Sequence, residues 1–96
     1  MSITIIATLK IKEGKMEEAK AALKETVPQV LAAEPGCLAY TPHTVRGEGN
    51  ENRIIFYEKY KDKEAFKTHG ANLGKYMAKL GPLVESSEIK SCNEFI

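Results

Sequence analysis

The chain has 96 residues, a length suited to one small domain, and 43% of them are hydrophobic and 28% charged. Its formal net charge of +1 provides no cationic field to hold nucleic acid or anionic lipid, and no apolar run approaches the ~20 residues of a membrane span. Residues 1–4 lack the basic-then-apolar layout of a signal peptide, and two cysteines cannot build a disulfide framework. We therefore expect one cytoplasmic domain over residues 1–96, with neither nucleic acid nor membrane as a partner.

The first half of the chain predicts a strand, a helix and a hairpin. Residues 3–11 alternate with period two and are rich in β-branched side chains, which predicts a strand. The apolar residues of 15–33 recur every three or four positions, as in an amphipathic helix. Residues 37–45 and 53–60 predict two strands joined by a polar turn, and Pro42 places the first of them at a sheet edge or a bulge.

The second half predicts one more helix and one more strand. Asp62 is a candidate N-cap for a helix that ends before Gly81, and the glycine at position 70 predicts a weak point or break within it. A more polar strand lies within residues 83–95. The order βαββαβ is typical of an α+β, ferredoxin-like fold, in which both helices cover one face of an antiparallel sheet.

Apolar residues occur on both faces of the predicted sheet. Ile6 lies opposite the odd-numbered apolar residues of its strand, and alternation in the second strand places Leu38 and Tyr40 on one face and Cys37 and Ala39 on the other. One layer of helices cannot cover both faces. We therefore expect a homodimer, in which the sheet of a second copy packs against the uncovered face to form an α/β barrel.

Sequence motifs for several common chemistries are absent. The chain contains no glycine-rich phosphate loop, no serine nucleophile elbow and no His-Glu-x-x-His. His43 and His69 are far apart and neither has a second ligand at helical spacing, so we expect no metal and no cofactor. Cys37 is interpreted as a small buried side chain rather than a nucleophile.

His69 is the most informative single residue. It falls with Ala65 and Phe66 on the apolar side of the second helix and so faces the sheet, where it needs a hydrogen-bond partner. Glu58 is the candidate partner. His69 is then either a core histidine that joins helix to sheet or a general base at the floor of a pocket, since imidazole titrates near neutral pH.

Aromatic and imidazole side chains supply candidate walls for such a pocket. Tyrosine rings combine an apolar body with a hydroxyl group, although each is also an ordinary core residue. The candidate substrate-binding residues are Tyr40, His43, Tyr60, Phe66 and Tyr76.

Two stretches resemble the antibiotic biosynthesis monooxygenase family. Residues 34–40 (Glu-Pro-Gly-Cys-Leu-Ala-Tyr) are similar to the family's corner between helix and strand, and residues 56–69 are similar to its strand, Asp-capped helix and histidine. The spacing from Glu58 to Asp62 and His69 fits the family. The resemblance covers essentially the whole chain and implies a dimeric α+β barrel.

The resemblance also implies a range of activities. Some members oxidise phenols or hydroquinones with O₂ and without metal or flavin, others isomerise small phosphorylated sugars, and one branch degrades haem. The haem branch uses an Asn in the first strand and a Trp, whereas residues 3–11 contain no Asn and the chain has no Trp. His69 matches the family histidine and Glu58 the family glutamate, while Tyr60 occupies a position often held by Trp.

The resemblance favours a cofactor-independent monooxygenase that uses O₂ and a small aromatic substrate, with His69 as base and Glu58 orienting the base or the substrate. Two alternatives remain: an isomerase of a small carbonyl metabolite that also uses His69, and a non-catalytic dimeric protein that binds a small ligand or acts in a stress response. Gly70 and Gly74 would form either a flap over the pocket or a plain helix break.

Overall fold

The computed structural model describes residues 2–96, and Met1, the first residue of the predicted domain, lies outside them. The elements are β1 (Ile3–Ile11), α1 (Met16–Ala33), β2 (Cys37–Thr44), β3 (Arg53–Tyr60), α2 (Lys63–Leu80), a short 3₁₀ turn (Gly81–Leu83) and β4 (Val84–Cys92). The strands form one antiparallel sheet in the order β2-β3-β1-β4. The predicted α+β, ferredoxin-like fold is confirmed.

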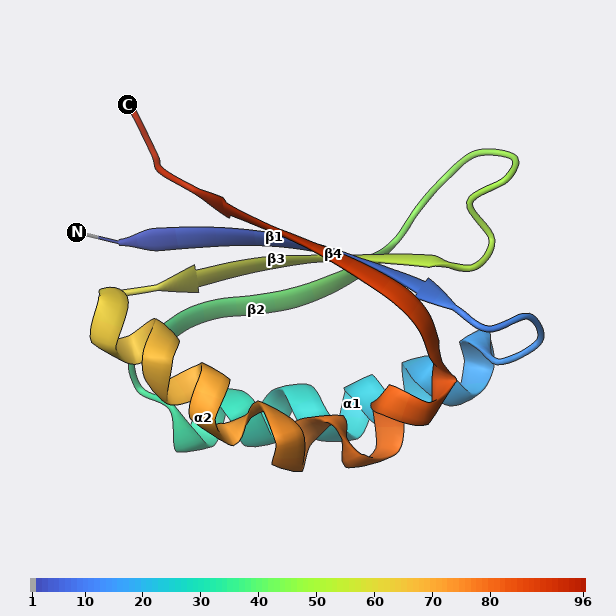
Figure 1. The fold of residues 1–96 in the computed structure, drawn as a ribbon, viewed down its shortest axis with the longest axis horizontal. Coiled ribbons are helices and arrows are strands. Elements are labelled where there is room, and N and C mark those ends of the chain that lie inside the picture. Colours follow the sequence, from blue (N-terminus) through green and yellow to red (C-terminus); the bar gives the residue numbers. More distant parts are fainter. Residues whose placement is uncertain (1) are drawn as a thin grey trace.

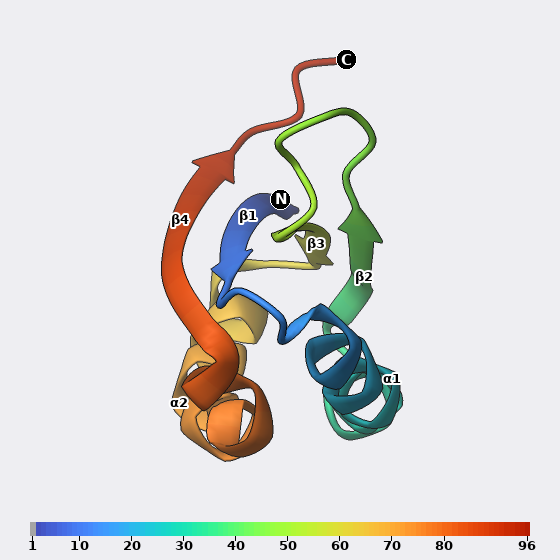
Figure 2. The same ribbon diagram turned by 90° about the vertical axis from the view of Figure 1, so that its right-hand side faces the viewer.

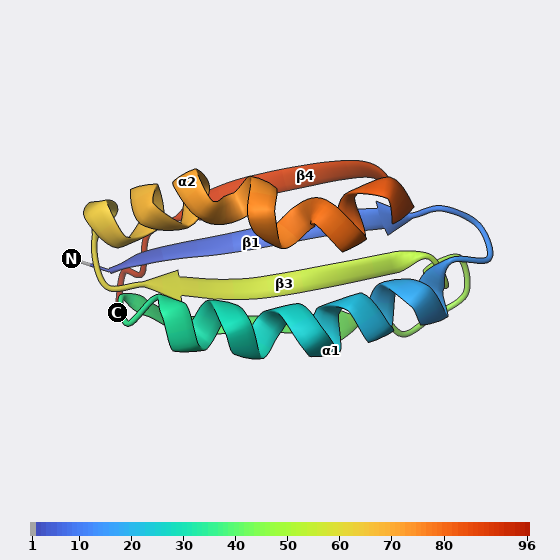
Figure 3. The ribbon, with the colours of Figure 1, turned by 90° about the horizontal axis from the view of Figure 1, so that it is seen from below.

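Both helices lie on the same side of the sheet (Figure 1). Seen from the helix side, α1 lies in front of β2, and α2 lies in front of β1, next to β4 (Figure 3). The chain between β2 and β3 and the C-terminal tail rise away from the helices (Figure 2). The core therefore forms between the helices and one face of the sheet, while the other face remains open.

The alternation of β1 and β3 decides which side chains enter that core. Ile5 and Leu9 of β1 are buried, and they pair directly across the ladder with Glu58 and Ile54 of β3. Because directly opposed residues project to the same face, the buried row of β3 carries Glu58 toward the helices as well. The opposite row, with Ile6 opposite Tyr57, faces away from the helices.

Two details of the elements were wrong or incomplete in the sequence prediction. The ladder shifts between Cys37 and Ala39, so Cys37 and Tyr40 are both buried on the helix side while Leu38 is 56% exposed. This bulge interrupts strict alternation. β2 lies at an edge of the sheet, one of the two positions that Pro42 predicted. The predicted break at Gly70 is absent, because α2 is continuous from Lys63 to Leu80.

Packing explains why α2 tolerates its glycines. Its buried residues Ala65, His69, Tyr76 and Leu80 recur at steps of four and seven residues, so they form one stripe against the sheet. The N-cap Asp62 accepts a hydrogen bond from the backbone N–H of Ala65 at 2.8 Å, as predicted. Each interior glycine costs about 1 kcal/mol relative to alanine, and burial of the stripe offsets that cost.

Candidate active site

A cavity of about 220 Å³ lies between α2 and the sheet. Its walls are mainly apolar, and its titratable groups are Glu58 and His69, together with the phenol of Tyr40. It reaches β4 at Ser87 and at Ile89, which is 60% exposed, so this side of the cavity is open to solvent. The remaining lining residues are Ile5, Ala7, Leu9, Phe56, Phe66, Gly70, Leu73, Met77, Leu80 and Val84.

His69 points from α2 into the interior and is 4% exposed. Its Nδ1 lies 3.1 Å from Oε1 of Glu34, which is also buried. Within residues 2–96, Nε2 forms no hydrogen bond with the protein, and it is not one of the fully occluded polar atoms without a partner. One ring nitrogen is therefore held by a carboxylate, and the other has no partner in residues 2–96 on a ring that lines the cavity.

The partner of His69 differs from the one predicted. Glu34, rather than Glu58, is within hydrogen-bond distance of the ring. The sequence placed Glu34 only in the corner between helix and strand, although it lies four residues after the fully buried Val30 and so continues the buried stripe of α1. That spacing is the signal that sequence reasoning missed.

Glu34 is fixed by the corner between α1 and β2. Its backbone N–H donates to the carbonyl of Val30 at 2.9 Å, and its own carbonyl accepts from the N–H of Cys37 at 2.9 Å. Its φ and ψ of −124° and 85° lie outside the helical region, as expected for a residue that precedes proline. The helix thus ends at Glu34 while the side chain still points inward.

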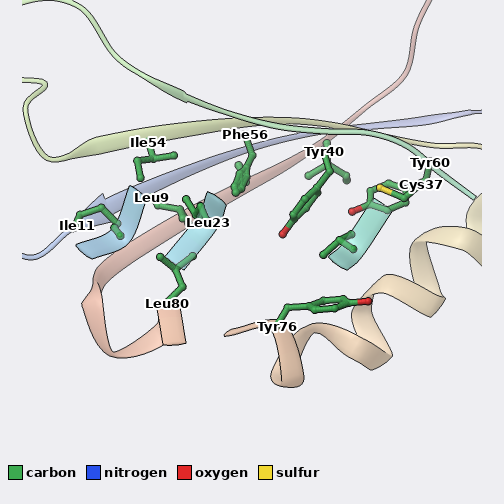
Figure 4. Packing of buried hydrophobic residues seen from close by; sticks show 14 of the residues in the cluster. Leu9, Ile11, Leu23, Cys37, Tyr40, Ile54, Phe56, Tyr60, Tyr76 and Leu80 are labelled. Carbon is green, nitrogen blue, oxygen red and sulfur yellow. The ribbon is translucent and has the colours of Figure 1, made fainter. Parts of the chain in front are cut away.

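Three tyrosine rings surround the imidazole. The ring centroids of Tyr40, Tyr60 and Tyr76 lie 5.1, 5.4 and 5.9 Å from that of His69. In Figure 4, Tyr40 projects from the sheet toward the helices, and Tyr76 lies below it on α2. The hydroxyl of Tyr76 and Oε2 of Glu34 are buried without a hydrogen-bond partner, and burial, then Glu34, raise the pKa of Tyr76.

Glu58 forms a second polar group of the site. The hydroxyl of Tyr60 donates to its Oε1 at 2.7 Å. Burial raises the pKa of the Glu58 carboxyl, an effect that the Tyr60 hydrogen bond and the charge of His69 oppose. Burial also raises the pKa of Tyr60 and Tyr40, and the nearby Glu58 carboxylate adds to this in both. Both phenols are therefore neutral hydrogen-bonding groups at neutral pH.

The predicted site residues lie in three different parts of the structure. Glu58, His69, Tyr40 and Phe66 line the cavity. Tyr60 and Tyr76 are buried beside the His69 ring, where they support the lining residues rather than form the wall. His43 lies elsewhere, exposed on the edge strand β2, with Nδ1 3.2 Å from the carbonyl oxygen of Ile55.

Cys37 is adjacent to this cluster but is not activated. Burial, followed by the charges of Glu34 and Glu58, raises the pKa of its thiol to about 11. The thiol donates to the carbonyl of Ala39 at 3.5 Å. A thiolate nucleophile is therefore disfavoured here, in agreement with the interpretation of Cys37 as a core residue.

The described residues contain neither a cluster of metal-ligating side chains nor a membrane-spanning helix. In residues 2–96, no three His, Cys, Asp or Glu side chains gather as they would around a metal ion. No helix in that range combines the length and apolarity needed to cross a membrane.

Comparison with known families and structures agrees with this geometry. The sequence model of the family described as antibiotic biosynthesis monooxygenase matches residues 2–73, which is three quarters of the chain and includes Glu34, Glu58 and His69. None of the curated proteins compared with the chain matches it.

Several solved structures are similar over nearly their whole length. One from Caulobacter crescentus, named as a proposed antibiotic biosynthesis monooxygenase, is 28% identical with a TM-score of 0.85 and covers 99% of this chain and 91% of its own. One of the same description from Bacteroides thetaiotaomicron is 26% identical, with a TM-score of 0.82 and coverage of 99% and 90%. A protein from Shewanella oneidensis is 32% identical, with a TM-score of 0.79 and coverage of 95% and 88%.

Proposed function

The chain belongs to the antibiotic biosynthesis monooxygenase family, and from this premise we propose that it oxidises a small phenol or hydroquinone with O₂ without a cofactor, using His69 as general base. The observation that carries the proposal is the position of His69. One ring nitrogen is held by Glu34, and the other is available beside an apolar cavity of about 220 Å³.

The chemistry requires an electron-rich substrate that reduces oxygen itself. Nε2 of His69 removes the phenolic proton, and the resulting phenolate is a stronger electron donor than the phenol. For a hydroquinone, one oxygen atom of O₂ replaces a ring hydrogen and the other leaves as water. The substrate provides all four electrons as it becomes a hydroxylated quinone, so the reaction balances without another reductant.

The surrounding residues have complementary roles in this proposal. Since Glu34 engages His69, the carboxyl of Glu58 is free to orient the substrate through its second oxygen while Tyr60 holds the first. Tyr40 and Phe66 form the wall beside the base. The apolar lining excludes water, which strengthens these interactions and protects a reactive intermediate.

The alternatives differ in what they require of the cavity. An isomerase of a phosphorylated carbonyl compound needs a cation for the phosphate, and the lining described here includes neither lysine nor arginine. A non-catalytic ligand-binding or stress-response protein would be favoured by a cavity filled with its own side chains or far from His69. The open cavity beside His69 supports catalysis instead.

We also propose that the open face of the sheet binds a second copy of the chain. Tyr57 is 37% exposed there, and it lies opposite Ile6 and two residues from the half-buried Ile55. A second sheet would cover this apolar row. Light scattering at micromolar concentration should give the mass of a dimer, and a monomeric mass would contradict this part of the proposal.

The experiment is oxygen uptake with a panel of hydroquinones. The wild-type protein should consume O₂ faster than the uncatalysed reaction for at least one of them, and His69→Ala should lower kcat by about 10²–10⁴-fold. His43→Ala is the matched control, since its imidazole lies outside the cavity. If wild type and His69→Ala both match the uncatalysed rate across the panel, the monooxygenase assignment fails.

A further inference from the structure

Glu34 occupies a position that is unfavourable for a carboxylate. It is 4% exposed and caps the C-terminal end of α1, where the helix dipole already presents partial negative charge. The last turn of α1, all of it described, carries no basic residue, and Oε2 has no hydrogen-bond partner. A residue needed only to end the helix would not require a buried carboxylate, so its contact with His69 explains its presence better.

The local backbone makes Glu34 a rigid support. Two hydrogen bonds fix its own peptide groups, and the N–H of Lys61 donates to the carbonyl of Gly36 at 2.9 Å, which ties the corner to the start of α2. Gly36 also packs so closely on Ala65 that an added Cβ would lie 2.6 Å from the Cβ of Ala65. Since Ala65 is one turn before His69, the same contact sets the distance between the carboxylate and the ring.

The chemistry of the pair determines where the imidazole proton lies. An ionised carboxylate only accepts hydrogen bonds, so Nδ1, at 3.1 Å from Oε1, must carry the hydrogen. In the neutral ring, Nε2 then keeps its lone pair, and this is the nitrogen on the cavity side. Glu58 does not provide the same restraint, because its hydrogen bond is with Tyr60.

We infer that Glu34 is a positioning residue, which holds His69 in the tautomer with hydrogen on Nδ1 and a basic Nε2 facing the cavity. The tautomer itself does not depend on the reaction, whereas its effect on turnover rests on the proposed function. After Nε2 accepts a proton, the carboxylate also stabilises the positive ring.

The test is ¹⁵N NMR of the two histidines, with His43→Gln used to assign the His69 signals. At a pH where the ring is neutral, the wild-type protein should show His69 with protonated Nδ1 and unprotonated Nε2. In Glu34→Gln the side-chain amide can either accept from Nδ1–H or donate to Nδ1, so the acceptor-only restraint is lost and the population with hydrogen on Nε2 should rise. Glu58→Gln is the matched control, because it makes the same chemical change at another buried glutamate and should keep the wild-type tautomer.

The outcomes separate this inference from the proposed activity. A wild-type ring with hydrogen on Nε2, or an unchanged tautomer in folded Glu34→Gln, overturns it. If Glu34→Gln does not fold, the wild-type spectrum alone decides. Where O₂ uptake is measurable, Glu34→Gln should lower kcat by about 10²–10⁴-fold with little change in KM. If the protein oxidises none of the hydroquinones, the NMR result still stands, and only the monooxygenase proposal is contradicted.

Discussion

Each helix of this protein has a hollow beside it, and the two hollows differ in volume and in the burial of their polar groups. The hollow along α1 and β2 is the larger, about 560 Å³ against about 220 Å³ for the cavity beneath α2. Its charged and imidazole groups are open to water: Lys24 and His43 are exposed and Lys20 is partly exposed. The smaller cavity instead contains Glu58 and His69, which are 7% and 4% exposed.

This difference shows that buried polar groups, rather than volume, indicate where chemistry can occur. Water surrounds the groups at the rim of the α1 hollow and screens their charges. In the α2 cavity, burial raises the pKa of Glu58, and a carboxylate lies within hydrogen-bond distance of His69. Four predictions test this contrast, beginning with the largest effect.

The two histidines should differ most in activity. His69→Gln should reduce kcat with an active hydroquinone by about 10²–10⁴-fold, because the amide cannot accept the phenolic proton. His43→Gln should leave kcat within about twofold of wild type, since that ring lies in the other hollow. Steady-state O₂ uptake measures both. Equal losses of kcat in the two variants would contradict the proposal that the reaction takes place in the α2 cavity.

The lining of the α2 cavity should control substrate access. Gly70 lines it, and an added Cβ would meet no atom within 4 Å, so Gly70→Leu should project a side chain into the entrance. We expect kcat/KM to fall by about 10- to 100-fold. Gly74→Leu is the control, because Gly74 has equally open surroundings one turn later but does not line the cavity.

Both leucine variants should keep or raise the melting temperature, because leucine favours helix over glycine by nearly 1 kcal/mol. A similar loss of kcat/KM in both would indicate a general effect on α2 instead of a blocked entrance.

The corner that supports the α2 cavity should be sensitive to a single methyl group. Gly36→Ala places Cβ 2.6 Å from the Cβ of Ala65, so β2 and α2 must separate. We expect the free energy of unfolding to fall by about 1–3 kcal/mol. Gly74→Ala adds the same methyl group in open space and should instead raise it by up to about 1 kcal/mol. Urea denaturation measures both. Equal free energies of unfolding for Gly36→Ala and Gly74→Ala would show that the backbone around Gly36 moves to accept the methyl group without cost.

The smallest effect is a pH dependence of stability from Glu58. Burial raises its pKa in the folded protein above the ordinary value of 4.5. Between these two pKa values the folded state binds more protons than the unfolded chain, so this contribution to stability is present below pH 4.5 and is lost as the pH rises through the folded pKa. Urea denaturation from pH 4 to 8 should show this decline in wild type and not in Glu58→Gln.

Glu48→Gln, which changes an exposed glutamate outside both hollows, is the control for that series and should follow the wild-type profile. A Glu58→Gln profile that also follows wild type would mean that Glu58 is equally ionised in the folded and unfolded states.

Periodicity along the chain predicted the order of the elements because it reflects local requirements. Period two in residues 3–11 and steps of three and four in residues 15–33 correspond to β1 and α1. The same logic placed His69 on the inner side of α2. The break predicted at Gly70 was wrong, because a local propensity of about 1 kcal/mol was outweighed by the packing of the whole helix.

The partner of His69 was not predictable in this way. Glu34 and His69 are 35 positions apart, and they meet only because the corner after α1 packs on the first turns of α2. Alternation grouped Glu58 with Phe56 and Tyr60 on one face of β3, but only the structure shows that this face is the covered one and which carboxylate reaches the ring. The bulge in β2 likewise moved Cys37 to the same face as Tyr40 against simple alternation.

By itself, then, the sequence determined the element types, their order, the α+β class and the inward direction of His69, since each depends on spacing within one segment. Tertiary structure alone decided that Glu34 holds the imidazole, that Tyr60 holds Glu58 and that His43 lies at a different hollow. The physical reason is that hydrogen bonds between segments depend on distances of a few ångströms. Those distances are set only when helices and sheet pack together.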